Sequence, residues 1–175
     1  MINCEWLPKL EPYDANIEWK SYESKLYDIF VNDFIKSTPI YQNNKIAIRK
    51  HPIEMGKEEA FFHVTCQDYL KDGERVPDLR RCERIRWVRK FIENYNCKRN
   101  CEFCSGMKVW EKPYKNTVRI HILLEEERYM VVLEKREKYN LLITAFYIEH
   151  DHTMRKKLEE YEKYKIKYKA KDASL

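Results

Sequence analysis

Three cysteines lie close together in the middle of the chain, at Cys97, Cys101 and Cys104. Thiolates at this spacing suit a tetrahedral zinc ion, whose fourth ligand would be Cys66, Cys82 or a histidine. The second cysteine pair of a zinc ribbon is missing, so free thiols are an alternative interpretation, and a disulfide or redox pair is a third. A zinc ion held by cysteines alone would brace this loop structurally and would not activate water.

A second set of candidate functional residues lies in the arginine-rich segment 77–87 (PDLRRCERIRW). Arginine forks match phosphate oxygens and a tryptophan ring can stack on a base, so Arg86 and Trp87 are candidate nucleic-acid contacts. Alternatively, Arg81 and Arg84 form ion pairs with carboxylates and hold a helix against the sheet. Both interpretations stay open from the sequence.

Histidine is the natural proton carrier near neutral pH. His63 lies in an apolar run, residues 57–66 (KEEAFFHVTC), that favours a strand, where a histidine is either a hydrogen-bonded core residue or a catalyst. Metal-free RNA cleavage needs a base for the 2′-hydroxyl proton, cations for the phosphorane and an acid for the 5′-oxygen. The hydroxyl of Thr144 and the side chains of Lys135 and Arg136, which precede the predicted strand of Thr144, also suit such a reaction.

The clearest structural signal is a strand meander over residues 117–125, 128–136 and 139–148, with turns of about two residues. Pairing Glu125 with Arg128 gives one apolar face and one polar face. The polar face carries the side chains of Arg119, His121, Glu134 and Arg136. On this face Arg119 lies directly opposite Glu134. A one-residue change in a turn swaps faces, so the pattern does not decide whether Thr144 or Tyr147 joins the polar face.

The remaining elements are predicted helices at residues 17–36, 78–95 and 153–169, and a strand at 107–111 that Pro113 ends. Asp78 is the predicted N-cap of the second helix. We therefore expect one domain of the α+β class, residues 1–175, in which an antiparallel sheet of about four strands within residues 107–148 packs against helices on one side.

Composition narrows the function further. The 175 residues carry a net charge of +5 and 14% aromatic residues, and three glycines leave no room for a Walker or dinucleotide phosphate loop. No apolar run approaches a membrane span or a signal peptide, so we expect a cytoplasmic protein with no membrane partner. Residues 153–171 hold the whole positive excess, which suits nucleic acid, or else a solvated helix face.

Three strings together resemble the phage- and mobile-element-associated PBECR families, nucleases named after barnase, EndoU, colicin-type and RelE-type toxins. They are GKEEAFFHVT (56–65), PDLRRCERIRW (77–87) and ERYMVVLEKREKYNLLITAFYI (127–148). The resemblance implies a BECR-like fold, a four-stranded antiparallel sheet with an N-terminal helical part. It also implies a site built from matching positions: His63, Arg81, Glu83, Arg84, Lys135, Arg136 and Thr144.

The resulting expectation is a metal-independent endoribonuclease of toxin type, with RNA as substrate, no catalytic cofactor, and a possible antitoxin or immunity protein as partner. Five further side chains are expected to contact substrate: Arg86, Trp87, Arg119, His121 and Tyr147. The alternative is a non-catalytic nucleic-acid-binding accessory protein of a phage or mobile element, with a structural zinc loop. The nuclease expectation requires that His63 and several cations surround one open pocket.

Overall fold

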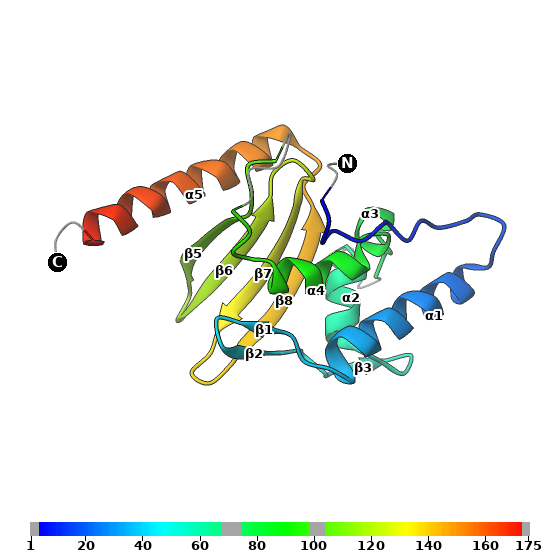
Figure 1. The fold of residues 1–175 in the computed structure, drawn as a ribbon. Coiled ribbons are helices and arrows are strands. Elements are labelled where there is room, and N and C mark those ends of the chain that lie inside the picture. The colour runs from blue at the N-terminus through cyan, green and yellow to red at the C-terminus, as the bar shows by residue number, and fades with distance from the viewer. Residues whose placement is uncertain (1–3, 68–74, 99–103, 173–175) are drawn as a thin grey trace.

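The computed structural model describes residues 4–67, 75–98 and 104–172, and the side chains of these residues as far as Tyr168. Its centre is a curled six-stranded sheet in the order β1-β2-β8-β7-β6-β5 (Figure 1). The strands are β1 (Ile40–Tyr41), β2 (Asn44–Ala47), β5 (Lys108–Tyr114), β6 (Thr117–Leu124), β7 (Tyr129–Lys135) and β8 (Asn140–Tyr147). A separate small hairpin pairs β3 (Ile53–Glu54) with β4 (Lys57–Glu58).

The α+β class is confirmed, but the prediction of a four-stranded antiparallel sheet is wrong. The long strands β5 to β8 do form an antiparallel meander. The hairpin of β1 and β2 then extends the sheet, because β2 pairs with β8 in parallel, Ile46 opposite Asn140. Because a parallel pair joins segments that are far apart in the chain, no local sequence pattern predicts it.

The helices lie on both faces of this sheet and not on one. They are α1 (Trp19–Phe30), the π-helical η1 (Val31–Ile35), α2 (Glu59–Thr65), α3 (Leu79–Cys82), α4 (Ile85–Glu93) and α5 (Asp151–Asp172). The main core joins α1, α2 and α4 to the sheet face that carries Ile120 and Ile122. A smaller core joins α5 to the opposite face, which carries Leu123 and Val132.

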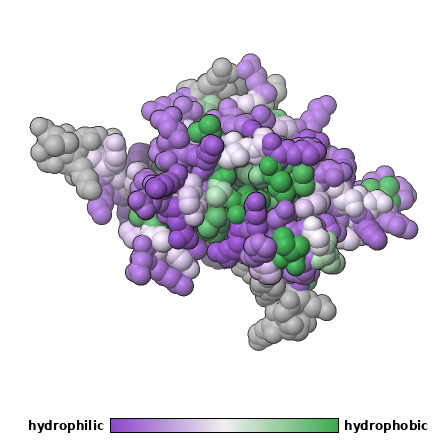
Figure 2. Space-filling view, turned by 90° about the horizontal axis from the view of Figure 1, so that it is seen from below, coloured by the Kyte–Doolittle hydropathy of each residue, from purple (hydrophilic) through white to green (hydrophobic). Residues whose placement is uncertain are grey.

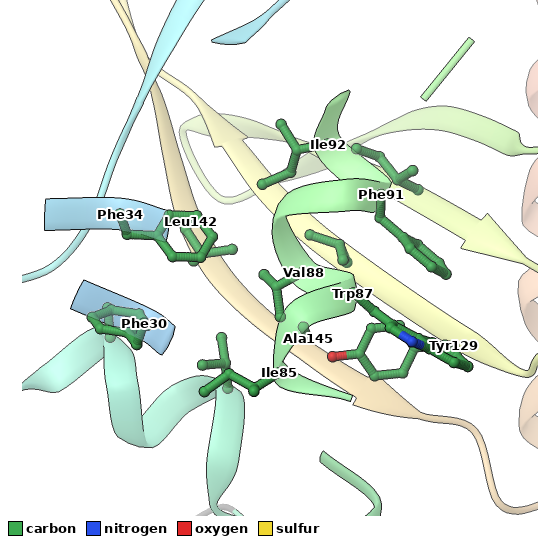
Figure 3. Packing of buried hydrophobic residues seen from close by; sticks show 14 of the residues in the cluster. Phe30, Phe34, Ile85, Trp87, Val88, Phe91, Ile92, Tyr129, Leu142 and Ala145 are labelled. Atoms are coloured by element: carbon green, nitrogen blue, oxygen red, sulfur yellow. The ribbon is translucent and has the colours of Figure 1, made fainter. Parts of the chain in front are cut away.

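The helix α4 provides the densest packing of the main core. Its apolar side chains point to the sheet between Tyr129 and Leu142, and Phe30 and Phe34 close the group (Figure 3). Trp87 is fully buried, lies parallel to Phe91 at 6.1 Å between ring centroids, and donates its indole N–H to the Pro8 carbonyl at 2.8 Å.

The predicted helix at residues 78–95 is interrupted. Asp78 caps its start as expected, accepting hydrogen bonds from the amides of Arg80 (2.9 Å) and Arg81 (3.3 Å). The chain leaves helical geometry at Arg84, with φ −103° and ψ 14°, which separates α3 from α4. Residues before and after Arg84 therefore do not follow one helical periodicity. As a result, the arginine side chains do not point in the directions that a continuous helix would give them.

Residues 57–66 were predicted to favour a strand, and they form β4 and then the helix α2. Ala60, Phe61, Phe62, Val64 and Thr65 are all buried. A short apolar run that is buried on every side cannot be assigned to helix or strand by periodicity. Packing of α2 beside β8 decides the outcome here.

The meander register is confirmed where it was predicted. Arg119 lies opposite Glu134, and His121 lies opposite Val132. The third strand contains an irregularity, with Val132 opposite Thr144 but Leu133 opposite Leu142, so Ile143 is a bulge residue. The sequence left open a change in a turn, and the change lies instead inside β8. Thr144 is opposite Val132 on the face of His121, and Tyr147 is opposite Tyr129 on the other face.

The N-terminal helix, β5 and α5 differ from prediction in detail. The N-terminal helix ends in η1 at Ile35, close to the expected boundary, and β5 continues through Pro113 to Tyr114. Proline is tolerated there because β5 is an edge strand. In α5, which begins at Asp151 and not at the expected residue 153, Met154 is buried in the smaller core, whereas Tyr168 is 56% exposed.

The surface is mostly hydrophilic. Seen from the end of the molecule at the bottom of Figure 1, charged and polar residues surround an apolar area in the middle of the face (Figure 2). Among the helices of the described residues, none has the length and apolar character needed to cross a membrane.

Candidate functional site

A solvent-open cavity of about 480 Å³ lies on the same face of the sheet as α5, beyond the part of that face that α5 covers. We call it the His63 cavity. His63 reaches it from α2, and the sheet contributes Glu134 from β7. Four cationic side chains line it: Arg49, Lys115, Arg119 and Arg136. Four cations around one carboxylate and one imidazole make this a site for an anion.

The two arginines from the sheet are held by a shared carboxylate. Arg119 Nε lies 3.7 Å from Glu134 Oε2, and Arg136 Nη2 pairs with Glu134 Oε1. The Arg119 guanidinium also lies over the Tyr114 ring, 3.5 Å from its centroid. The Glu134 side chain is only 8% exposed, but Arg119 and Arg136 keep 27% and 40% of theirs exposed. The guanidinium groups are thus fixed in place while still reachable by a ligand.

The imidazole of His63 is oriented by a buried carboxylate one helical turn earlier. His63 Nε2 lies 3.1 Å from Glu59 Oε1, and Arg75 Nη2 lies 2.5 Å from Glu59 Oε2. Glu59 is buried, whereas the His63 side chain is 30% exposed. This arrangement fixes the ring at the cavity wall, and a buried acid that orients an imidazole is a recurring device of acid–base sites.

The main chain of His63 is anchored as well. Its carbonyl oxygen accepts hydrogen bonds from Thr144 Oγ1 at 2.8 Å and from Arg81 Nη1 at 3.2 Å. The two donors lie 3.4 Å from each other. The structure therefore brings three predicted site residues together, but Thr144 and Arg81 contact the backbone of His63 and do not line the cavity.

The expected convergence of the arginine helix on this cavity does not occur. Arg84 is buried, donates to the Arg80 carbonyl at 3.0 Å and pairs with Glu83, which the resemblance had placed in the site. Its guanidinium packs 4.8 Å from the Tyr147 ring and 5.1 Å from the Trp87 ring. The helix break at Arg84 directs these side chains to the opposite side of β8 from the His63 cavity.

Four other predicted contacts also lie elsewhere. Lys135 pairs with Glu111, because it alternates with Glu134 and takes the other face of β7. Arg86 Nε pairs with Glu11 at 2.5 Å. Trp87 is fully buried and offers no ring face to a base, and Tyr147 lies beneath Arg80 and Arg84.

His121 shares the face of Arg119 but lies under α5. Its ring stacks on Trp110 with centroids 4.9 Å apart, and the residue is 6% exposed. Burial, with the nearby charge of Lys157, lowers the pKa of His121 to about 4. The imidazole is therefore neutral at physiological pH and belongs to the smaller core.

The zinc prediction rests partly on Cys101, which lies outside the described residues. Cys104 is buried, its sulfur accepts the Gly106 amide at 3.4 Å, and Cys97 is partly exposed. In the part of the chain that the structure describes, no three metal-ligating side chains gather into a site. The zinc loop stays a prediction.

Sequence reasoning missed four residues of the site, one of which is Lys115 in the turn between β5 and β6. Arg49 follows β2, and only the parallel pairing of β2 with β8 brings it to the cavity. Tyr114 extends β5 beyond the proline expected to end it. Glu59 stands four residues before His63, and this spacing would have signalled a pair had the segment been assigned as a helix.

Comparisons with known proteins add no assignment. A scan against protein-family models, a search of curated proteins and a search of solved structures each find no match to this chain. What the protein does is inferred below from its own geometry.

Proposed function

We propose that this protein is a metal-independent endoribonuclease of toxin type that acts on RNA in the bacterial cytoplasm. One observation carries the proposal: the His63 imidazole and three arginines, Arg49, Arg119 and Arg136, line the same open cavity. An imidazole moves protons near neutral pH, and arginine forks bind phosphate oxygens. The likeness of three sequence segments to the PBECR families points the same way.

In the proposed reaction, His63 takes the proton of the 2′-hydroxyl. The 2′-oxygen attacks the adjacent phosphorus, the bond from phosphorus to the 5′-oxygen breaks, and a 2′,3′-cyclic phosphate forms. Glu59 holds His63 Nε2, so proton exchange with the substrate falls to Nδ1. No second histidine lines this cavity among the described residues, so the departing 5′-oxygen takes its proton from water or from the His63 imidazolium.

Arg119 and Arg136 stabilise the charge that develops on the phosphorane. Their ion pairs with Glu134 fix both guanidinium groups before the substrate arrives. Charged groups that need no reorganisation during the reaction stabilise a transition state most effectively. These two arginines and Arg49 replace Arg81, Arg84 and Lys135, which the sequence favoured. Thr144 and Arg81 act as positioning residues for His63.

The decisive experiment incubates purified protein with total RNA in EDTA and maps 2′,3′-cyclic phosphate ends. We expect such ends with the parent protein, and a rate roughly 10²- to 10⁴-fold lower with His63→Gln. His152→Gln is the matched control, because His152 is exposed on α5 and lies outside the cavity. Circular dichroism of each variant establishes that it is folded.

Parental rates with His63→Gln, or a requirement for Mg²⁺, would refute the mechanism. RNA binding without cleavage, weakening steeply as salt rises, would instead favour the non-catalytic accessory protein. A nuclease of toxin type also requires a partner that restrains it, and an acidic antitoxin or immunity protein would suit the cations of the His63 cavity.

A further inference from the structure

A second cavity, of about 370 Å³, lies between the edge strand β5 and the outer half of α5. We call it the α5 cavity. The helix continues past the edge of the sheet, and its outer half lies clear of the other elements (Figure 1). The α5 cavity is lined by aromatic rings and lysines, which are Trp110 and Lys112 from β5, and Lys163, Tyr164, Lys167 and Tyr168 from α5.

The carboxylates near the α5 cavity are already neutralised. Glu160 Oε1 pairs with Lys112 Nζ at 2.6 Å, and Glu111 pairs with Lys135. Within the described residues, no carboxylate lies at ion-pair distance from Lys163 or Lys167. These two lysines are four residues apart on one side of α5, about 6 Å along its axis, and they give the cavity a net positive charge.

The same cavity presents aromatic faces. The rings of Tyr164 and Tyr168 stack at 6.1 Å with an interplanar angle of 28°, and Tyr168 is 56% exposed. Lysines beside exposed aromatic rings are the combination that proteins use for single-stranded nucleic acid, because every base can stack whatever its identity.

The α5 cavity is joined to the His63 cavity across the sheet. Lys112 lies directly opposite Arg119, and Arg119 lies directly opposite Glu134. Residues opposite each other on neighbouring strands point to the same face, and the strands lie about 4.8 Å apart. Two basic side chains, Lys112 of the α5 cavity and Arg119 of the His63 cavity, thus lie side by side on the face that both cavities share.

We propose that the α5 cavity holds the single-stranded flank of the RNA whose scissile phosphate lies in the His63 cavity. This inference rests on the proposed function, and it names the substrate class: single-stranded RNA long enough to cross three strands of the sheet. Tyr168 and Tyr164 stack on bases of the flank, while Lys163 and Lys167 contact its phosphates.

The test measures binding of uncleavable 2′-O-methyl RNA of four and of sixteen nucleotides by fluorescence anisotropy. The variant is Lys163→Glu with Lys167→Glu. Its matched control is Arg155→Glu with Lys156→Glu, which makes the same charge change at exposed positions of α5 outside the cavity. We expect the first variant to weaken binding of the longer RNA several-fold more than the control. Its salt slope should fall by about 1.4, the value for two lost phosphate contacts on a single strand.

Stacking is tested separately. Tyr168→Leu should weaken binding of the longer RNA by about fivefold or more, whereas Tyr168→Phe, which keeps the ring, should bind like the parent. Binding of the four-nucleotide RNA should be unchanged in both. Equal binding by all variants, or equal weakening of both RNAs, would overturn the proposal. So would a parent dimer that becomes a monomer in these variants while RNA binding stays unchanged.

Cleavage of a dinucleotide by the same proteins separates the two proposals. If the parent cleaves it but the α5 variants bind long RNA normally, the α5 site is wrong and the nuclease stands. If neither the dinucleotide nor total RNA is cleaved but long-RNA binding depends on α5, the nuclease is wrong and the α5 site stands.

Discussion

Thr144 donates its hydroxyl hydrogen to the main-chain carbonyl oxygen of His63 across 2.8 Å, and so ties the end of α2 to the middle of β8. The two residues are distant in sequence, yet this bond sets the height of the imidazole above the sheet. Arg81 supports the same oxygen from a third element. The position of His63 therefore depends on contacts that do not involve its ring.

We expect Thr144→Val to lower the free energy of unfolding by about 1 kcal/mol, since it removes one hydrogen bond while Arg81 still serves the carbonyl. RNA cleavage should fall as well, because the ring of His63 is displaced. Thr144→Ser should restore both. Urea denaturation and initial cleavage rates measure the two effects, and a Thr144→Val protein that is less stable but fully active would contradict the positioning role.

The neighbours Lys135 and Arg136 give a direct test of which face of the sheet is active. Arg136→Ala should reduce kcat/KM for RNA by about tenfold or more, as expected for a lost charge-assisted contact of roughly 1.5–3 kcal/mol. Lys135→Ala should leave it nearly unchanged, because Lys135 pairs with Glu111 on the other face. The reverse outcome would place the site on the other face of β7, where Lys135 pairs with Glu111.

Stability should depend on pH through His121. Its pKa is lowered to about 4 in the folded protein, chiefly by burial, so the unfolded chain binds the proton more readily between pH 4 and 6.5. The free energy of unfolding should thus fall as pH is lowered through this range, by up to about 3 kcal/mol.

Denaturation curves at pH 7 and pH 4.5 measure that loss. His121→Phe keeps the stack on Trp110 and cannot be protonated, so its loss over this range should be smaller than that of the parent. His152→Gln, at an exposed position, should behave like the parent. A parental loss in His121→Phe would show that another group governs the pH dependence.

Chelation should leave RNA cleavage unchanged, because we assign proton transfer to His63 and charge stabilisation to arginines. The measurement is the cleavage rate before and after dialysis against EDTA, with zinc content determined on the same samples. Zinc that is lost on dialysis, or in Cys97→Ser, while folded protein retains its rate would show that the zinc is not catalytic, and a lower free energy of unfolding of the zinc-free protein would identify a bracing role. Activity that returns only with added metal would contradict the assignment.

The local pattern predicted the meander well, because alternation along β6 and β7 fixes which side chains share a face. Arg119, Glu134 and Arg136 were thus placed together correctly. The pattern failed for α2, whose apolar residues are buried on all sides, and for the helix interrupted at Arg84. In both places tertiary packing decides the backbone, and the arginines predicted to reach the site depended on that backbone.

The sequence did not predict Arg49 as a cation of the cavity, for a related reason. Arg49 reaches the His63 cavity only through the parallel pairing of β2 with β8, a contact between distant parts of the chain. Whether Lys135 or Arg136 faces the cavity depends on a single step of strand alternation. The sequence indicated a site with a histidine and several cations, and the strand topology determines which cations line it.

That parallel pairing also bears on how the protein is made. Ile46 leaves the ribosome long before Asn140, its partner, so the cavity walls contributed by the first half of the nascent chain wait for the second half. A long-range closure of this kind comes late in folding. If the protein is a toxin, the cell that translates it meets no finished active centre until β8 has been made, which leaves an interval in which a restraining partner can bind.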